Sequence, residues 1–226
     1  MGEALAQIER EVVGCRLCPR LVAWREHVAT EKVARHREQT YWGRPVPGFG
    51  DPGARIVLVG LAPGAHGSNR TGRMFTGDGS GDFLWPALFA AGLASQPVSR
   101  SRDDGMRATD LWITAAVRCA PPDNKPLPSE RDNCAPYLVR ELAALERARV
   151  VIALGAFGWD AALRTFGALG AAVPAPKPKF AHGTEVQVGR WTLLGSYHVS
   201  QQNTFTGRLT RPMLDAVFAR AVELAR

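Results

Sequence analysis

Four cysteines have a spacing suited to holding a metal cofactor. Cys15 and Cys18 form a C-x2-C pair, and Cys119 and Cys134 have fourteen residues between them. Four thiolates can bind a [4Fe–4S] cluster or a zinc ion. A structural zinc site usually combines two pairs of cysteines, each pair separated by only a few residues. Cys119 and Cys134 are too far apart in the sequence to form such a pair. The pattern therefore favours a [4Fe–4S] cluster that clips the N-terminal helix to the rest of the chain. A zinc site and four separate buried cysteines are the alternatives.

A glycine-rich loop from Ala62 to Gly81 carries a second group of chemically useful side chains. It contains neither the phosphate-loop pattern nor a dinucleotide fingerprint directly after a strand. It holds one aromatic ring, one carboxylate and two guanidiniums, which are Phe75, Asp78, Arg70 and Arg73. Stacking, hydrogen bonds and positive charge together suit a planar polar ligand that lies near phosphates.

A third candidate segment is the loop 198–209, which opens with His198. Between Tyr197 and Arg211 the chain has no acidic residue, and amide side chains follow the histidine. Amides can bond phosphates or base edges. A lone histidine after a strand is more often structural than catalytic, and the character of this loop favours the catalytic interpretation.

The charge balance favours a polyanionic partner. The 226 residues include 28 Lys and Arg against 21 Asp and Glu, which gives a net charge of +7. The N-terminus has no apolar signal segment and no apolar run is long enough to span a membrane, so we expect a soluble cytoplasmic protein. Four cysteines in that compartment indicate metal binding or catalysis more than disulfides.

Apolar strand patterns alternate with helical patterns along the chain. Continuous apolar runs predict buried strands at 55–61, 110–117 and 149–154, and 185–197 predicts a strand pair. Residues 3–23 predict one long helix, and VPAPKPKF predicts a stiff surface connection. The order predicts an α/β fold, a three-layer α/β/α domain over residues 1–226 around a central, mostly parallel four-stranded sheet. Ligands of such sheets bind beyond the carboxyl ends of the strands, where loops 62–81, 118–128 and 198–209 are expected.

Together these segments resemble the family-five uracil-DNA glycosylases of bacteria and archaea. GLAPGAHGSNRTGRMFTGDGSG and SYHVSQQNTFTGRLT are similar to the two signature motifs of that family. The cysteine positions are similar to the cluster ligands of families four and five. The resemblance covers nearly the whole chain in order. It implies an enzyme that flips a deaminated base out of DNA, whether uracil, hypoxanthine or xanthine, and hydrolyses its N-glycosidic bond. We expect it to act as a monomer.

The resemblance also implies how the base is held. Phe75 would stack on the flipped base, and Asn124, in the stretch PPDNKP, would hydrogen-bond its polar edge. Gly64 and Ala65 would line the base pocket. Further residues are expected to contact the DNA: Arg70, Arg73, Lys125, Ser200, Gln201, Gln202, Asn203 and Arg208.

Two side chains are expected to act on the reaction itself. His198 would donate to O2 of the leaving uracil, and Asp78 would position the attacking water. The base leaves as an anion from a sugar that becomes cationic, so the transition state resembles that of glycoside hydrolysis. A donor placed at a developing anion is typically worth about 2.7–4 kcal/mol.

The sequence departs from related motifs in three places, one of which is Met74, where proline is often found. Ala65 and His66 stand where related families place a polar or acidic water-activating residue, a lack that family five shares. Val199 replaces the proline that commonly follows the motif histidine. A non-catalytic iron–sulfur protein that binds DNA is the alternative function. A redox protein is less favoured because no flavin or nicotinamide motif is present.

Overall fold

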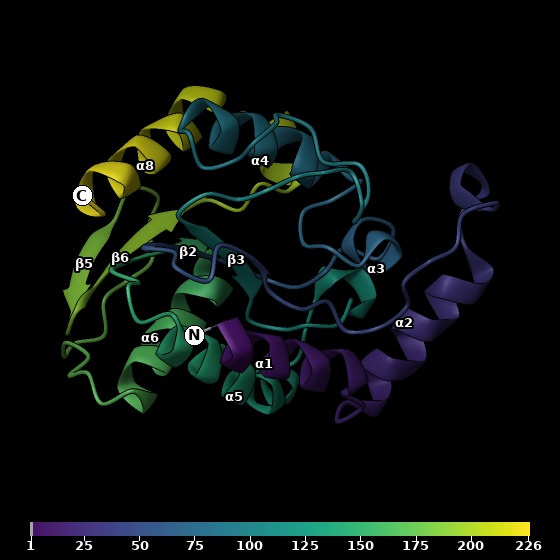
Figure 1. Ribbon diagram of the computed structural model, residues 1–226, viewed down its shortest axis with the longest axis horizontal. Coiled ribbons are helices and arrows are strands. Elements are labelled where there is room, and N and C mark those ends of the chain that lie inside the picture. The colour runs from purple at the N-terminus through teal and green to yellow at the C-terminus, as the bar shows by residue number, and fades with distance from the viewer. Residues whose placement is uncertain (1) are drawn as a thin grey trace.

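A six-stranded sheet lies between two layers of helices in the computed structural model, which describes residues 2–226 (Figure 1). The four central strands are parallel: β3 (Leu111–Ala115), β2 (Ile56–Gly60), β4 (Val150–Leu154) and β6 (Trp191–Ser196). Two antiparallel edge strands complete the order β1-β3-β2-β4-β6-β5, with β1 at Phe49–Gly50 and β5 at Glu185–Val188. The predicted three-layer α/β/α architecture is confirmed. The two short edge strands extend the predicted sheet of four to six.

The helices divide between the two faces of the sheet (Figure 1). One face is covered by α1 (Gly2–Gly14), α5 (Pro128–Ala144) and α6 (Ala156–Ala168). The other is covered by α4 (Gly79–Ala90) and α8 (Arg211–Leu224). The remaining helical elements are α2 (Pro19–Glu31), α3 (Ser68–Thr71), α7 (Gln201–Phe205) and two 3-10 turns, Ala34–His36 and Pro122–Asn124.

Strand β2 shows why the sequence pattern is continuous and not alternating. Ile56 and Leu58 pack in the core beneath α4 and α8, whereas Val57 and Val59 pack in the core beneath α1, α5 and α6. Both faces are buried, so every position is apolar.

The predicted helix over 3–23 is wrong in its extent. The chain forms two helices, α1 and α2, that are separated by the C-x2-C segment. Cys18 is extended (φ −113°, ψ 93°) and Pro19 occupies the first turn of α2. Proline disfavours a helical residue before it but fits the first helical position, so the break falls at this point. The two cysteines therefore lie at the junction of two helices.

The order of the strands creates a crevice. From β2 the chain passes to β3 on one side and later returns to β4 on the other side of β2. The helices that follow β2 and β4 cover opposite faces of the sheet, so the loops after these strands diverge. Such a switch point is where ligands bind in open α/β sheets. No helix within residues 2–226 is long and apolar enough to cross a membrane.

Candidate functional site

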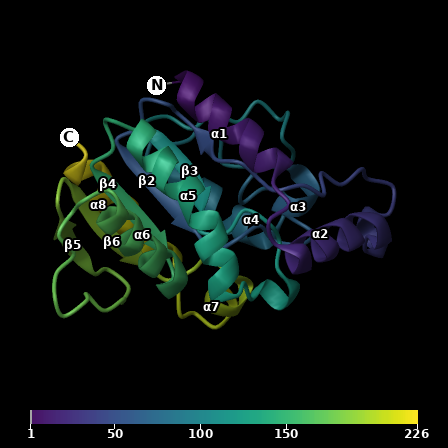
Figure 2. The ribbon, with the colours of Figure 1, turned by 90° about the horizontal axis from the view of Figure 1, so that it is seen from below.

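The loops after β2 and β6 meet beyond the carboxyl ends of the parallel strands. The ring centroids of Phe75 and His198 lie 6.4 Å apart, with their planes inclined by 43°. His198 also lies beside Gly155 at the end of β4, where an added Cβ would be 3.5 Å from its own Cβ. Figure 2 shows α7, which follows His198, on the side of the molecule away from the N-terminus. The two candidate residues thus meet at the switch point.

Phe75 is held in a strained backbone conformation. Its φ of +51° lies in the left-handed region, which costs a non-glycine residue about 1–3 kcal/mol. Its N–H donates to Ser68 Oγ at 3.0 Å, and its carbonyl accepts from the Trp85 indole at 2.6 Å. The ring lies over Gly60, where an added Cβ would be 2.8 Å from Phe75 Cζ. Phe75 is only 5% exposed, so most of its ring is covered by the surrounding protein. Strain of this kind is typical of functional sites.

His198 is a neutral imidazole near pH 7. Burial lowers its pKa to about 4. Within residues 2–226 the ring has no hydrogen-bond partner, so the single N–H of the neutral form is free for a ligand. Asn203 Nδ2 donates to the His198 carbonyl at 2.8 Å, and the side chain of Val199 is fully buried. These contacts hold the backbone at Val199, the position at which related motifs have a proline.

Asp78 performs a structural task. It is the N-cap of α4, and its Oδ1 accepts from the N–H groups of Ser80 and Gly81 at 3.1 Å each. Its Oδ2 faces two glycines: an added Cβ would lie 2.9 Å from it at Gly64 and 1.8 Å at Gly67. Burial raises the pKa of Asp78, and the two backbone N–H groups oppose that shift. The carboxylate therefore joins the start of the glycine-rich loop to the start of α4.

The segment 64–69 is a compact turn that places the predicted pocket residues. Gly64 accepts through its carbonyl from the N–H of Asn69 at 3.0 Å, at the beginning of α3. Ala65 and His66 follow within this turn, and both are half-buried. The hydroxyl of Tyr41 lies 3.1 Å from His66 Nδ1. The His66 side chain is thus engaged with Tyr41 within the protein.

Helix α7 packs against the start of α4. An added Cβ on Gly79 would lie 2.7 Å from Gln201 Nε2, so the Gln201 amide lies over the residue after Asp78. Ser200 is the half-buried N-cap residue of α7, and Gln202 is exposed. The two signature loops therefore touch.

Asn124 and Lys125 lie in an exposed turn after β3. Asn124 has a φ of +55°, a conformation that asparagine tolerates well, and its side chain is exposed. The carbonyl of Lys125 accepts from Arg20 Nη2 at 3.0 Å, which ties the turn to α2. The structure thus fixes the turn but does not bring Asn124 into direct contact with Phe75.

The four cysteines come from three parts of the chain. Cys18, Cys119 and Cys134 are buried in a small core with Leu21, whereas Cys15 is half-buried. All four thiols are free. Among residues 2–226, no three Cys, His, Asp or Glu side chains stand close enough to form a metal-binding group.

Two ion pairs bring together the elements that carry these cysteines. Arg118 and Glu141, both buried, pair at 2.5 Å and join the end of β3 to α5. Arg20 and Glu130 pair at 2.8 Å and join α2 to α5. Removing one partner of a buried pair typically costs about 3–5 kcal/mol, which applies to Arg118 and Glu141; Arg20 is 38% exposed and contributes less.

Two of the four sulfurs accept hydrogen bonds from neighbouring side chains. Arg25 Nη1 donates to Cys119 Sγ at 3.0 Å, and Asn133 Nδ2 donates to Cys18 Sγ at 3.4 Å. Hydrogen bonds to sulfur and buried thiolates are what tune such clusters. Burial raises the pKa of the Cys119 thiol to about 12 and that of Cys134 to about 11, so a bound metal is what would make them thiolates.

Comparison with known proteins identifies the family. Residues 47–222 match the model of the uracil DNA glycosylase superfamily. The chain belongs to that superfamily.

The chain is also similar to individual members of the family. It is 55% identical over 215 residues to a type-5 uracil-DNA glycosylase of Thermus thermophilus, covering 95% of each chain. It is 52% identical over 224 residues to a type-5 uracil-DNA glycosylase of Mycobacterium tuberculosis, covering 98% of this chain and 82% of the relative. A type-4 uracil-DNA glycosylase of Archaeoglobus fulgidus is 34% identical over 156 residues, 69% of this chain and 61% of that protein. The predicted resemblance is confirmed.

Two arginines of the glycine-rich loop are engaged by acceptors within the protein. Arg73 is 3% exposed and pairs with Asp104 at 2.7 Å, so the prediction that it contacts DNA is wrong. Arg70 donates to the carbonyls of His66 and Gly77 at 2.7 and 2.6 Å and to Gln39. All three of its nitrogens bind protein acceptors. Both guanidiniums brace the loop that carries Phe75.

The structure also reveals residues that motif reasoning missed. Phe205, at the end of α7, is 80% exposed in the midst of the polar second motif. In the sequence, Phe205 is the one aromatic residue in the polar stretch QQNTFT, and this contrast could have marked it as a candidate. Arg208, which was predicted to contact DNA, lies over the Tyr197 ring at 4.7 Å from its centroid, and Tyr197 directly precedes His198.

Proposed function

We propose that this protein is a DNA repair glycosylase that hydrolyses the N-glycosidic bond of uracil in DNA and leaves an abasic site. We propose further that it accepts hypoxanthine and xanthine. The observation that carries the proposal is the pairing of a strained Phe75 with a neutral His198, 6.4 Å apart, in a member of the uracil-DNA glycosylase superfamily. The enzyme acts as a monomer in the cytoplasm, with residues 1–226 as one domain.

Base capture depends on stacking and on an amide. Flipping a base out of the duplex costs a few kcal/mol, and stacking on Phe75, worth roughly 1–3 kcal/mol, offsets much of that. Asn124 reads the polar edge of the base, and its exposed turn must approach the site when DNA binds. Gly64 and Ala65 present backbone with little side chain, which suits close approach of a flat base.

His198 stabilises the departing anion. The neutral imidazole has one N–H, which no group of the described chain engages, and it lies beside the ring on which the base would stack. Donation to the anion strengthens as the bond breaks, so it lowers the barrier and does not merely tighten substrate binding. A strong nucleophile is unnecessary because the sugar carries the positive charge.

Asp78 would position the attacking water through Oδ2. Its Oδ1 is engaged by α4, whereas Oδ2 faces the Gly64–Gly67 turn. The same carboxylate thus orders the loop and offers an acceptor near the sugar. In a dissociative reaction the sugar is already cationic when water attacks, so positioning the water matters more than removing its proton.

The loop from Ser200 to Arg208 engages the DNA around the emptied position. Gln201, Gln202 and Asn203 bond phosphates or base edges, and Arg208 and Lys125 contact phosphates. Apolar side chains can enter the base stack and hold the duplex open. Phe205 is placed for this, because it is 80% exposed on the loop that follows His198.

The cysteines Cys15, Cys18, Cys119 and Cys134 would bind a [4Fe–4S] cluster. When bound, the cluster supplies a covalent cross-link between the α1–α2 junction, the end of β3 and α5. The residues of the chain carry out the reaction without it. Asn69 connects this region to the active-site loop, since its Nδ2 donates to the Arg25 carbonyl at 3.2 Å.

Excision assays test the proposal. Duplexes that carry one uracil, hypoxanthine or xanthine are incubated with the protein and then cleaved with alkali. Strand breaks at the modified position are expected with the wild type and are strongly reduced with His198→Ala. Tight, salt-sensitive binding without any alkali-labile site would contradict the proposal and leave a non-catalytic DNA-binding protein.

A further inference from the structure

The segment 174–182, which leads into β5, lies directly beside the loop that carries His198. The backbone N–H of Tyr197 donates to His182 Nδ1 at 3.2 Å, and the two rings stack with centroids 5.1 Å apart. Phe180 packs edge-on against Tyr197 at 6.3 Å. The stretch predicted only as a surface connection therefore adjoins the active-site loop at the carboxyl edge of the sheet.

Prolines and an indole keep this segment in one shape. Three prolines alternate with other residues over 174–178, and each fixes its own φ and removes a backbone donor. Trp159 Nε1 donates to the Pro178 carbonyl at 2.9 Å, and its ring meets Phe180 at 6.0 Å. A segment held in this way loses little conformational freedom when it binds a partner.

The segment is basic and exposed. The chain has four lysines, and two of them, Lys177 and Lys179, are here; no acidic residue occurs from 161 to 184. Both lysines are exposed. Lys177 pairs with Asp160 at 2.6 Å, and no ion pair is found for Lys179 within the described part of the chain. Arg208 stacks on Tyr197 at 4.7 Å. Tyr197 thus joins two basic elements, Arg208 on the second motif and the lysine segment.

We propose that the segment 174–182 is a second binding surface for the DNA backbone, with Lys179 as its main phosphate contact and Lys177 as an auxiliary one. The inference rests on the proposed action on DNA and extends it beyond the two signature loops. The ligand chemistry is a row of phosphates, recognised by charge and independent of base sequence. The contact is expected on the DNA that flanks the flipped nucleotide, because Tyr197, which contacts His182 of this segment, is the residue directly before His198.

The test measures affinity as a function of salt for Lys179→Ala and for the double variant Lys177→Ala/Lys179→Ala. The probe is a duplex with a tetrahydrofuran abasic analogue, which binds but cannot be cleaved. Each lost phosphate contact should reduce the slope of log K against log salt by about 0.9. Affinity at low salt should fall by a few-fold to about tenfold, and the difference from wild type should shrink as salt rises. Excision at enzyme concentrations below saturation should fall in proportion to the affinity.

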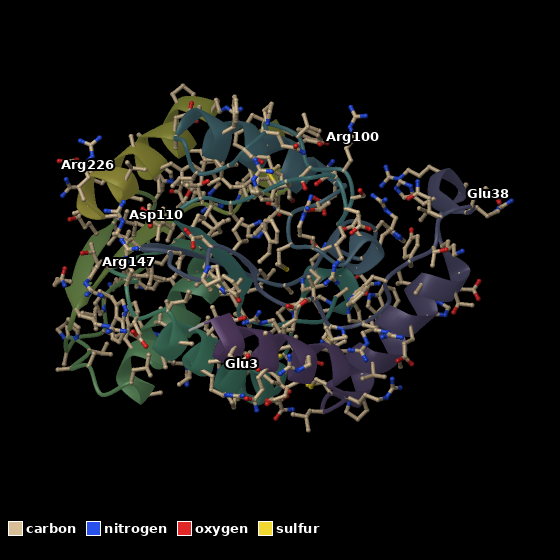
Figure 3. The ribbon with its side chains drawn as sticks, viewed as in Figure 1. Glu3, Glu38, Arg100, Asp110, Arg147 and Arg226 are labelled. Carbon is tan, nitrogen blue, oxygen red and sulfur yellow. The ribbon has the colours of Figure 1, made fainter. Side chains whose placement is uncertain are left out.

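Arg147→Ala is the matched control. Arg147 is exposed and precedes β4, at the amino edge of the sheet; Figure 3 labels it close to Asp110, which precedes β3. The Arg147→Ala variant also removes one positive charge, but at the opposite edge of the sheet. Its slope of log K against log salt should therefore equal that of the wild type. If Lys179→Ala and the double variant keep the wild-type slope, or if Arg147→Ala loses as much as they do, the segment is not a backbone contact. Failure of the wild type itself to bind the probe and excise uracil would overturn the proposed function as well.

Discussion

The Arg25 guanidinium donates to Cys119 Sγ at 3.0 Å, from a side chain only 2% exposed. Its Nη groups also lie 3.3 Å from the Cys15 carbonyl, and its Nε has no partner among residues 2–226. A buried cation without a buried counter-charge is costly. Glu26 pairs with Arg25 at 3.6 Å, but the Glu26 side chain is 44% exposed. Thiolates around an iron–sulfur cluster would supply a buried negative charge in addition.

The first prediction concerns this contact. Wild-type protein purified without oxygen should be brown and carry about four irons, and Arg25→Gln should retain less iron. Its cluster should also have a more negative reduction potential, because a nearby cation favours the reduced state. Iron content and potentiometry provide the measurements. Arg140→Gln, which changes an exposed arginine paired with Glu11, is the control. A colourless protein with one zinc ion would contradict the cluster, and unchanged iron and potential in Arg25→Gln would contradict the role of Arg25.

The second prediction separates stacking from base reading. Phe75→Ala should slow excision of uracil, hypoxanthine and xanthine alike, because it removes roughly 1–3 kcal/mol of stacking. Asn124→Ala should change the ranking of the three bases, since their polar edges differ. Its side chain is exposed, so stability should be unaffected. Single-turnover rates on the three duplexes measure both effects. Equal slowing of every base by Asn124→Ala would show that it does not read the base.

The third prediction concerns Phe205. Phe205→Ala should lower excision from duplex DNA about tenfold and affect single-stranded DNA much less, because only a duplex must be held open. Thermal stability should not change, since the ring is 80% exposed. Phe89→Ala removes a ring that is 46% exposed on α4 and should have no effect on either substrate. Equal losses on both substrates would indicate a contact other than a wedge.

The parallel architecture explains how much of the site could be predicted. Strands β2 and β6 were identifiable as apolar runs, and the carboxyl ends of parallel strands share one edge. It follows that Phe75 and His198 meet although 123 positions separate them in the sequence.

Other features depend on partners that no local pattern indicates. From the sequence, Arg73 could bind a phosphate or form a buried ion pair. The structure shows the ion pair, and its partner Asp104 lies far from Arg73 along the chain. The exposure of Phe205 and the contact of Tyr197 with His182 likewise arise from tertiary packing.

The fourth prediction exploits the double task of Asp78. Asparagine is as good an N-cap as aspartate, whereas alanine costs typically about 1 kcal/mol. Asp78→Asn should therefore keep the wild-type Tm, and Asp78→Ala should lower it by about 2–4 °C. If Oδ2 positions the water, both variants should excise uracil several-fold more slowly. Normal excision by Asp78→Asn would leave Asp78 with the capping role alone.

The pKa of His198 has a consequence for stability. Burial lowers the pKa from 6.5 to about 4, so the unfolded chain binds a proton more readily than the folded protein. His198 then contributes stability above pH 6.5, and this contribution is lost as pH falls toward 4. Between these values the wild type should lose more unfolding free energy than His198→Gln, which has no titrating group at this position. Urea denaturation at a series of pH values measures the difference.

The fifth prediction assigns the leaving-group role to His198. Because the imidazole is already neutral, the excision rate should show no step near pH 6.5 that depends on His198. His198→Ala should lower the single-turnover rate on uracil by roughly 100-fold or more, while binding to DNA with the abasic analogue stays close to wild type. Asp78→Asn should cost less than this. The competing explanation is that His198 merely supports its loop, in which case abasic-DNA binding and Tm would fall together with the rate. If His198→Ala retains most of the excision rate while Asp78→Asn abolishes it, the roles of the two residues are reversed.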